Sequence, residues 1–249
     1  MMNMNNYLSR IGISDEGEAT MDYLQQLQYR HVTQIPFENM DILQEIPLSL
    51  NSFEIYEKIV TRRRGGVCYE LNGLFHVLLR ELGFSVSMVA ATVNVNGSWF
   101  KEGTHATNLV QLGGLKYLVD VGFGGQTPRR PIPLTGEEIQ DADGYYRVRS
   151  YPEEAGQMIL EKKETEWTML YKFSLQARVL ADFENVCLFT QNGEESKFNK
   201  KLLIMIVTDQ GRATLSDHSL TIVNGKNKIK ETIEPEALQR IIQETFKIG

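Results

Sequence analysis

Apolar residues in the first third of the chain recur at the spacing of an α-helix. Directly after Cys68 they fall at i, i+3, i+4 and i+7, the pattern of a helix with one buried face. These positions are Leu71, Leu74, Phe75, Leu78, Leu79 and Leu82. Gly83 follows as the expected helix end. Earlier helices are expected after the acidic run 14–18, with Ser14 as candidate N-cap, and after Ser52.

From Phe84 onward the hydrophobic period changes to two, which indicates β-strands. Asn96-Gly97 and Gly113-Gly114 have the composition of two-residue hairpin turns. The strands expected around and after them cover 84–90, 91–95, 104–112, 115–123, 145–151, 158–162 and 168–176. Several short strands joined by tight turns predict a small antiparallel β-barrel.

The last section mixes strands with one helix. Strands are expected at 202–208, 212–215 and 219–223, and Pro235 suits the first position of a final helix that runs to Phe246. We therefore predict an α+β fold of three parts. They are a helical bundle at 1–84, a β-barrel at 85–186 and an α/β lid at 187–249.

The segment before the Cys68 helix carries the candidate chemistry. A cysteine in the first helical turn faces free backbone N–H groups and the positive end of the helix dipole, which favour a thiolate. Gly65-Gly66 permits a tight backbone path, and Arg64 is expected to add positive charge near the thiol. The alternative, a small buried residue on an apolar helix, is the usual role of a lone cysteine. The flanking residues favour a nucleophile here.

A nucleophilic thiol needs a base, and His105 is the best of the four histidines. If Gly113-Gly114 closes a two-residue hairpin, position 107 faces 120 and 105 faces 122. His105 and Asp120 then share one face of the sheet as diagonal neighbours, about 7–8 Å apart at the backbone. An acid among apolar strand residues is expected to be paired. Cys68, His105 and Asp120 are thus a candidate catalytic triad.

The other histidines fit this role less well. His76 is eight positions further along the helix than Cys68, too far to reach the thiol. His31 has no acid in a defined geometry, and His218 lies in a polar turn where exposure to solvent is expected.

Composition narrows the function classes. The chain has 249 residues and a formal net charge of −6, and no basic stripe suggests a nucleic-acid partner. Only two cysteines occur, which fits a reducing compartment and excludes a disulfide framework. The residues Met1 to Ser9 lack the pattern of a signal peptide, and no apolar run approaches the length of a membrane span. We expect a cytoplasmic protein with no membrane partner.

Four segments together resemble the arylamine N-acetyltransferases of bacteria. They are Arg64-Gly65-Gly66-Val67-Cys68-Tyr69-Glu70-Leu71-Asn72, Pro36-Phe37-Glu38-Asn39, Thr104-His105 and Val119-Asp120-Val121-Gly122-Phe123-Gly124. The similarity spans nearly the whole chain and weakens after about Asp182, where Asn192-Gly193-Glu194-Glu195 departs from the Ser/Pro-rich stretch that the family leads one to expect.

The resemblance implies a fold and an activity. The fold is a helical bundle, a β-barrel and an α/β lid, with a Cys-His-Asp triad of the cysteine-protease type in the cleft between them. The activity is ping-pong transfer of an acetyl group from acetyl-CoA, through a thioester on Cys68, to an arylamine or arylhydrazine, with a role in xenobiotic metabolism.

The resemblance also implies binding residues. Phe37 and Phe123 would line the aromatic acceptor pocket. The CoA would be contacted by Thr104, Gly124, Gly125, Gln126 and Thr127, since backbone N–H groups of a glycine-rich loop can bind phosphate. Arg129 and Arg130 would either face CoA or be solvated, and we favour the interpretation that they are solvated.

Other function classes stay open at this point. A cysteine hydrolase or amidase of the transglutaminase or papain type would use the same triad, with water in place of the amine. A non-catalytic binding module would not need all three triad residues. A zinc site is not indicated, because Cys68 and Cys187 lack paired-ligand spacing. The physiological amine, the acyl-chain preference and the oligomeric state do not follow from the sequence.

Overall fold

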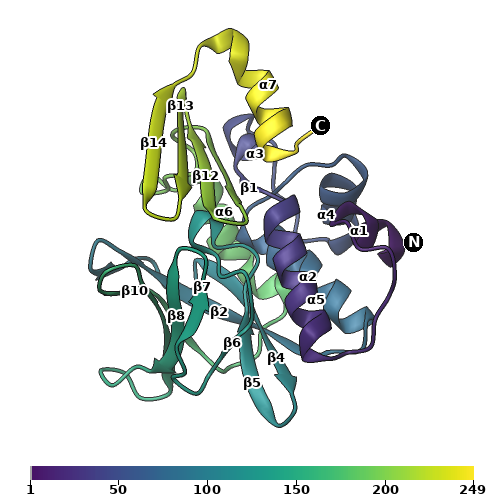
Figure 1. Ribbon diagram of the computed structural model, residues 1–249, viewed down its shortest axis with the longest axis vertical. Helices are drawn as coiled ribbons and strands as arrows, with labels where there is room; N and C mark the ends of the chain where they lie inside the picture. The colour runs from purple at the N-terminus through teal and green to yellow at the C-terminus, as the bar shows by residue number, and fades with distance from the viewer. Residues whose placement is uncertain (1) are drawn as a thin grey trace.

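A computed structural model describes residues 2–249 and shows three groups of elements (Figure 1). The N-terminal helices lie on the right of the view, the barrel strands at lower left, and the C-terminal strands and helix at the top. The helices of the first group are α1 (Met4–Arg10), α2 (Met21–Gln34), α3 (Met40–Leu43), α4 (Ser52–Tyr56) with its π-helical continuation Glu57–Thr61, and α5 (Cys68–Glu81).

Two helix starts differ from the sequence prediction. Helix α2 begins at Met21 with Thr20 as N-cap, whose side chain accepts the Tyr23 N–H. The predicted cap Ser14 instead hydrogen-bonds its neighbour Asp15, an alternative to helix that short polar side chains often take. The N-cap of α4 is Asn51, one residue before the predicted cap Ser52. Helix α1 was not predicted as a separate helix.

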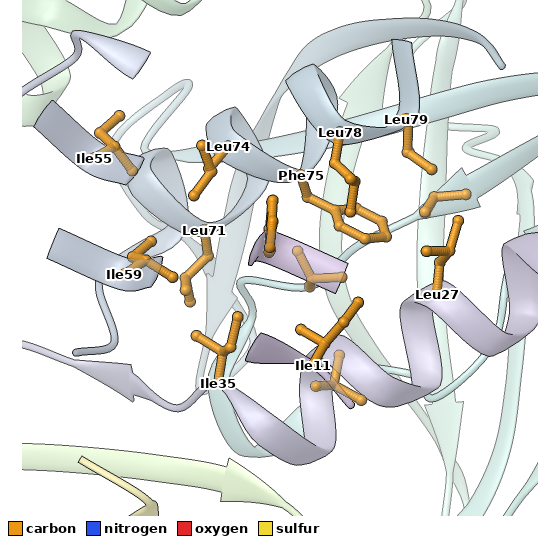
Figure 2. Close-up of a cluster of buried hydrophobic side chains, with 14 of the residues drawn as sticks. Ile11, Leu27, Ile35, Ile55, Ile59, Leu71, Leu74, Phe75, Leu78 and Leu79 are labelled. Carbon is orange, nitrogen blue, oxygen red and sulfur yellow. The ribbon is translucent and has the colours of Figure 1, made fainter. Parts of the chain in front are cut away.

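The predicted helical face of α5 is the centre of the main hydrophobic core. Figure 2 shows its leucines and Phe75 directed toward Leu27 of α2, and toward Ile55 and Ile59 of the α4 segment. All of the labelled α5 side chains have no exposed surface. Burying a side chain of this size contributes about 1.5–3 kcal/mol, so this packing fixes the axis of α5.

The central part is an antiparallel sheet that curls into a nearly closed barrel, with strand order β6-β5-β4-β2-β10-β9-β8-β7 and β3 paired to β2. Its strands are β2 (Ser85–Val95), β3 (Ser98–Trp99), β4 (His105–Leu112), β5 (Leu115–Val119), β6 (Ile132–Pro133), β7 (Ile139–Asp141), β8 (Gly144–Ser150), β9 (Gln157–Lys163) and β10 (Trp167–Ser174). The segments expected at 84–90 and 91–95 form the single strand β2.

Both predicted hairpin turns are present. Asn96 and Gly97 have φ values of 53° and 87°, and Gly113 and Gly114 of 60° and 80°. Two successive residues in the left-handed region are what a type I′ turn requires.

The C-terminal part begins with a 3₁₀ turn, Leu180–Phe183, and α6 (Glu184–Asn192), which runs across the boundary expected at 186/187. A five-stranded sheet follows in the order β1-β11-β12-β13-β14. Its members are β1 (Phe37–Glu38), β11 (Leu203–Val207), β12 (Gly211–Ser216), β13 (Ser219–Asn224) and β14 (Asn227–Thr232), and α7 (Pro235–Phe246) covers it. Pro235 begins α7 as predicted.

Two features of this sheet did not follow from the sequence. Strand β1 comes from the N-terminal part, with Phe37 opposite Met205 of β11. Strand β14 is exposed at every position and so lacks an alternating hydrophobic pattern. No helix within residues 2–249 combines the length and the apolar character of a membrane span.

Candidate active site

Cys68 is the first residue of α5, and Val67 is its N-cap. The Glu70 carboxylate accepts the Val67 N–H at 3.0 Å, which fixes the backbone immediately before the cysteine. Neither Gly65 nor Gly66 lies in the left-handed region. They are required instead for close packing, since a Cβ on Gly66 would lie 2.7 Å from a Glu70 carboxylate oxygen.

Arg64 does not supply positive charge to the thiol as expected. Its Nη2 lies 2.8 Å from both Glu38 Oε1 and Asp41 Oδ1, so two carboxylates neutralise the guanidinium. Lys58 continues this buried network, with its Nζ 2.7 Å from Asp41 and 2.9 Å from Glu70. The network therefore anchors the start of α5, and Glu38 and Asp41 compensate the Arg64 charge.

His105 and Asp120 meet through the β4–β5 hairpin. Leu112 pairs with Leu115 across the turn, as expected from Gly113-Gly114. Continuing this register brings the His105 Nε2 to 2.7 Å from the Asp120 Oδ2. Both side chains are buried, with exposed fractions of 3% and 0%. Asp120 lies just beyond the end of β5. Its hydrogen bond with His105 agrees with the expectation that an acid among apolar residues is paired.

Three further donors hold the Asp120 carboxylate. The Tyr171 hydroxyl donates to Oδ2 at 2.7 Å. The Asn72 amide donates to Oδ1 at 2.9 Å, and the Gly122 N–H donates to it at 2.8 Å. None of these three donors was predicted from the sequence. Asn72 could have been found from its position one helical turn after Cys68, whereas Tyr171 comes from β10 and has no local signal.

This environment sets the protonation of the His–Asp pair. Burial alone would lower the pKa of His105, but the Asp120 carboxylate and then Cys68 outweigh it and raise the pKa to about 10. Burial would raise the pKa of Asp120, but His105, Asn72 and the Gly122 N–H hold it below its usual value. Asp120 occupies Nε2 of the imidazole, which leaves Nδ1 as the nitrogen available to Cys68. An imidazolium beside a thiol favours the thiolate.

A cavity of about 260 Å³ opens onto Cys68 and His105. Its wall contains Thr104 and five aromatic side chains, Phe37, Phe100, Phe123, Phe189 and Phe198. The structure thus brings the two phenylalanines expected in an acceptor pocket to the same cavity as the thiol. The Phe123 ring also packs edge-on against the His105 ring, with centroids 5.1 Å apart.

The loop 124–127, expected near CoA, does not line this cavity. The space beside Gly124 is filled by Met205, and the space beside Gly125 by Arg212. Both covering residues belong to the C-terminal sheet. Gly124 and Gly125 are therefore packed against the C-terminal sheet, Thr127 is also buried, and Gln126 is exposed.

Arg129 contradicts the interpretation as a solvated residue. It is 6% exposed and binds the Asp143 carboxylate at 3.2 Å as well as Asp141. Its Nε donates to the Thr208 carbonyl at 2.8 Å, which ties the barrel to the lid. Arg130 is exposed, as expected.

The remaining candidates lie outside the cavity lining. His31 is fully buried between the rings of Tyr7 and Phe75, His218 is exposed, and Cys187 is buried in α6. Residues 2–249 contain no group of three His, Cys, Asp or Glu side chains arranged to hold a metal ion.

Comparison with known proteins identifies the class. Residues 20–249 match the family model described as N-acetyltransferase. The arylamine N-acetyltransferase of Escherichia coli (strain K12) is 32% identical over 252 aligned positions, covering 99% of this chain and 89% of that protein. The crystal structure of an arylamine N-acetyltransferase from Bacillus cereus, described as having a unique Cys-His-Glu catalytic triad, matches with a TM-score of 0.93 at 31% identity over 100% of both chains.

A third match is the Mycobacterium marinum arylamine N-acetyltransferase in complex with CoA, with a TM-score of 0.91 at 33% identity over 99% of this chain and 93% of that one. These TM-scores show that the chain has the fold of the arylamine N-acetyltransferases. The chain belongs to the arylamine N-acetyltransferase family of acyltransferases. Here the acid bound to His105 is Asp120, in contrast to the glutamate of the Bacillus cereus protein.

Proposed function

We propose that this protein transfers an acetyl group from acetyl-CoA to an arylamine or arylhydrazine by a ping-pong mechanism, with Cys68 as the nucleophile. The observation that carries the proposal is the convergence at one cavity. Cys68 lies at the start of α5, and His105 lies beside it with its Nε2 bound to Asp120. This is the arrangement that activates a thiol for attack on a carbonyl.

In the first half-reaction the Cys68 thiolate attacks the carbonyl carbon of acetyl-CoA. The imidazolium of His105 gives its proton to the departing CoA sulfur, so a neutral histidine and an acetyl thioester remain. In the second half-reaction the amine attacks the thioester, and His105 takes the proton that the amine nitrogen loses. The thiolate leaves, which restores the starting ion pair. Asp120 holds the imidazole in one orientation and stabilises its charged form.

The cavity supports the choice of acceptor. Its five phenylalanine side chains favour a planar, apolar amine over a flexible charged one. Phe37 and Phe123 are the proposed contacts of the acceptor ring. A solved relative binds CoA, which supports acetyl-CoA as the donor. Thr104 lies in the cavity wall and would contact the donor there.

The proposed contact of the loop 124–127 with the CoA phosphates has a structural condition. Met205 and Arg212 fill the space beside the Cα atoms of Gly124 and Gly125, so a phosphate that approaches the loop from that side has to displace them. A location in the cytoplasm and a role in xenobiotic metabolism stay predictions.

A cysteine hydrolase with the same triad is the alternative, and one assay separates the two. Free CoA is measured after acetyl-CoA is added with and without an arylamine, in the parent and in Cys68→Ala. A transferase releases CoA continuously only when the amine is present, and acetylated amine appears in equal amount. Continuous release of CoA and acetate without any amine would establish the hydrolase instead. The Cys68→Ala variant should do neither.

A further inference from the structure

Tyr69 directly follows the nucleophile, and its hydroxyl joins three parts of the molecule. It donates to the Thr104 carbonyl at 2.9 Å and lies 3.1 Å from the Thr190 hydroxyl. Thr104 immediately precedes β4, and Thr190 belongs to α6. The helical part, the barrel and α6 therefore meet at one buried oxygen atom.

The same carbonyl faces the nucleophile. The Cys68 Sγ lies 3.8 Å from the Thr104 oxygen, within reach of a weak S–H donation. A thiol can satisfy that oxygen with its proton, whereas a thiolate cannot. An unpartnered carbonyl at this position would therefore favour the neutral thiol. The Tyr69 hydroxyl is a stronger donor than the thiol, and it binds the same oxygen. The Thr104 carbonyl therefore no longer needs the Cys68 proton as a hydrogen-bond donor.

We propose that Tyr69 is a positioning residue whose hydroxyl binds the Thr104 carbonyl and so directs the Cys68 proton to His105. The inference deepens the proposed function and rests on it for its role in acetyl transfer. The bond also fixes the residue before His105, so the imidazole keeps its orientation toward the thiol. Burial, and then the neighbouring Cys68, raise the pKa of Tyr69, so the hydroxyl retains its proton and remains a donor.

Other groups around the thiol do not replace this effect. Burial raises the pKa of Cys187 to about 12, so α6 presents a neutral thiol. Glu70 is bound by Lys58 at 2.9 Å and 3.0 Å, which compensates its charge. The titratable groups that surround Cys68 are His105 with its partner Asp120, Tyr69, Glu70, Cys187 and the exposed Lys197 at the cavity wall.

Tyr69→Phe tests the proposal because it removes only the hydroxyl and keeps the ring that packs 5.7 Å from the Phe183 ring. The matched control is Tyr56→Phe. Tyr56 is also buried and also donates to a backbone carbonyl, that of Asn3 at 2.9 Å, whereas Cys68 Sγ lies against the carbonyl of Thr104. Iodoacetamide alkylation of Cys68 is followed by peptide mass against pH in the parent and both variants, with thermal melts on the same samples.

We expect the alkylation profile of Tyr69→Phe to move upward by about 0.5–1 pH unit. This equals a three- to tenfold slower reaction at a fixed pH below the midpoint, the effect of one ordinary hydrogen bond. Tyr56→Phe should follow the parent profile. Coincidence of the Tyr69→Phe and parent profiles would overturn the proposal, and so would an equal shift in Tyr56→Phe.

The result is independent of the transfer reaction. Alkylation needs no acetyl donor, so a Tyr69-dependent profile can be found even in a protein that never forms a thioester. Failure of the parent to be acetylated by acetyl-CoA would refute the proposed function and leave the alkylation result standing. A normal acetylation with an unchanged Tyr69→Phe profile would refute only the role of Tyr69.

Discussion

Replacing Asp120 by asparagine separates the proposed triad from a simple Cys–His pair. The carboxylate accepts four hydrogen bonds, two on each oxygen, from His105, Tyr171, Asn72 and Gly122. An asparagine has one carbonyl oxygen and one NH₂ group. An NH₂ group at the Oδ1 position would face the Asn72 amide and the Gly122 N–H, which only donate. At the Oδ2 position it would instead donate to Nε2 of a neutral His105, which holds the imidazole in the tautomer that cannot take the thiol proton at Nδ1.

The structure sets the size of both effects. The substitution removes one charge of a buried pair, and breaking such a pair costs about 3–5 kcal/mol, so we expect the fold to be destabilised by about that amount. The chemistry should suffer separately, because His105 loses the charge that stabilises its protonated form. Removing the acid of an analogous triad costs about four orders of magnitude in rate. We expect at least a hundredfold slower acetylation of Cys68.

The assay must report folding and chemistry independently. Single-turnover acetylation is measured at a temperature where thermal melts show the variant to be folded. Asp143→Asn is the matched control, since the Asp143 side chain is only 5% exposed, is bound by Lys162, Arg212 and Arg129, and does not line the cavity. The control should lose stability and keep its acetylation rate per folded molecule. A folded Asp120→Asn that acetylates near the parent rate would remove Asp120 from the triad.

Three further substitutions have defined outcomes. Gly122→Ala places a Cβ 2.6 Å from the Asn72 amide and 2.9 Å from the Cys68 Cα, so single-turnover acetylation should fall at least tenfold while urea denaturation shows a loss of about 1–3 kcal/mol. Burial, and then Arg10, lower the pKa of His31 to about 3. Below pH 6.5 His31 is therefore protonated in the unfolded chain and neutral in the folded protein, which favours unfolding. His31→Phe should therefore lose less unfolding free energy than the parent between pH 7 and pH 5, by about 2 kcal/mol, and equal losses in urea titrations would contradict this. Cys187→Ala, which removes a buried thiol outside the cavity lining, should keep most acetyl transfer, and a folded but inactive variant would challenge Cys68 as the nucleophile.

Local patterns predicted the elements that carry the site. The helical spacing after Cys68 and the Gly113-Gly114 turn each depend on neighbouring residues, so α5 and the β4–β5 hairpin follow from the sequence. The hairpin register alone was enough to bring His105 and Asp120 together.

Contacts between distant segments were not predictable in this way. Tyr171 reaches Asp120 from a strand 51 positions further along the chain. Arg129 looks like a surface residue in a proline-rich loop, yet the folded barrel and lid bury it and supply its acceptors. Strand β1 has only two residues, and they form a strand only because they pair with β11. These three contacts depend on the tertiary arrangement, and no hydrophobic periodicity in the sequence indicates them.

The central claim is that Cys68 carries the acetyl group between the two half-reactions. Intact-protein mass spectrometry after mixing with acetyl-CoA alone, followed by peptide mapping, tests it most directly. We predict one added acetyl group, located on Cys68, that disappears when an arylamine is added and does not form in Cys68→Ala. An unmodified protein that still acetylates the amine, or an acetyl group mapped to another residue, would contradict the account.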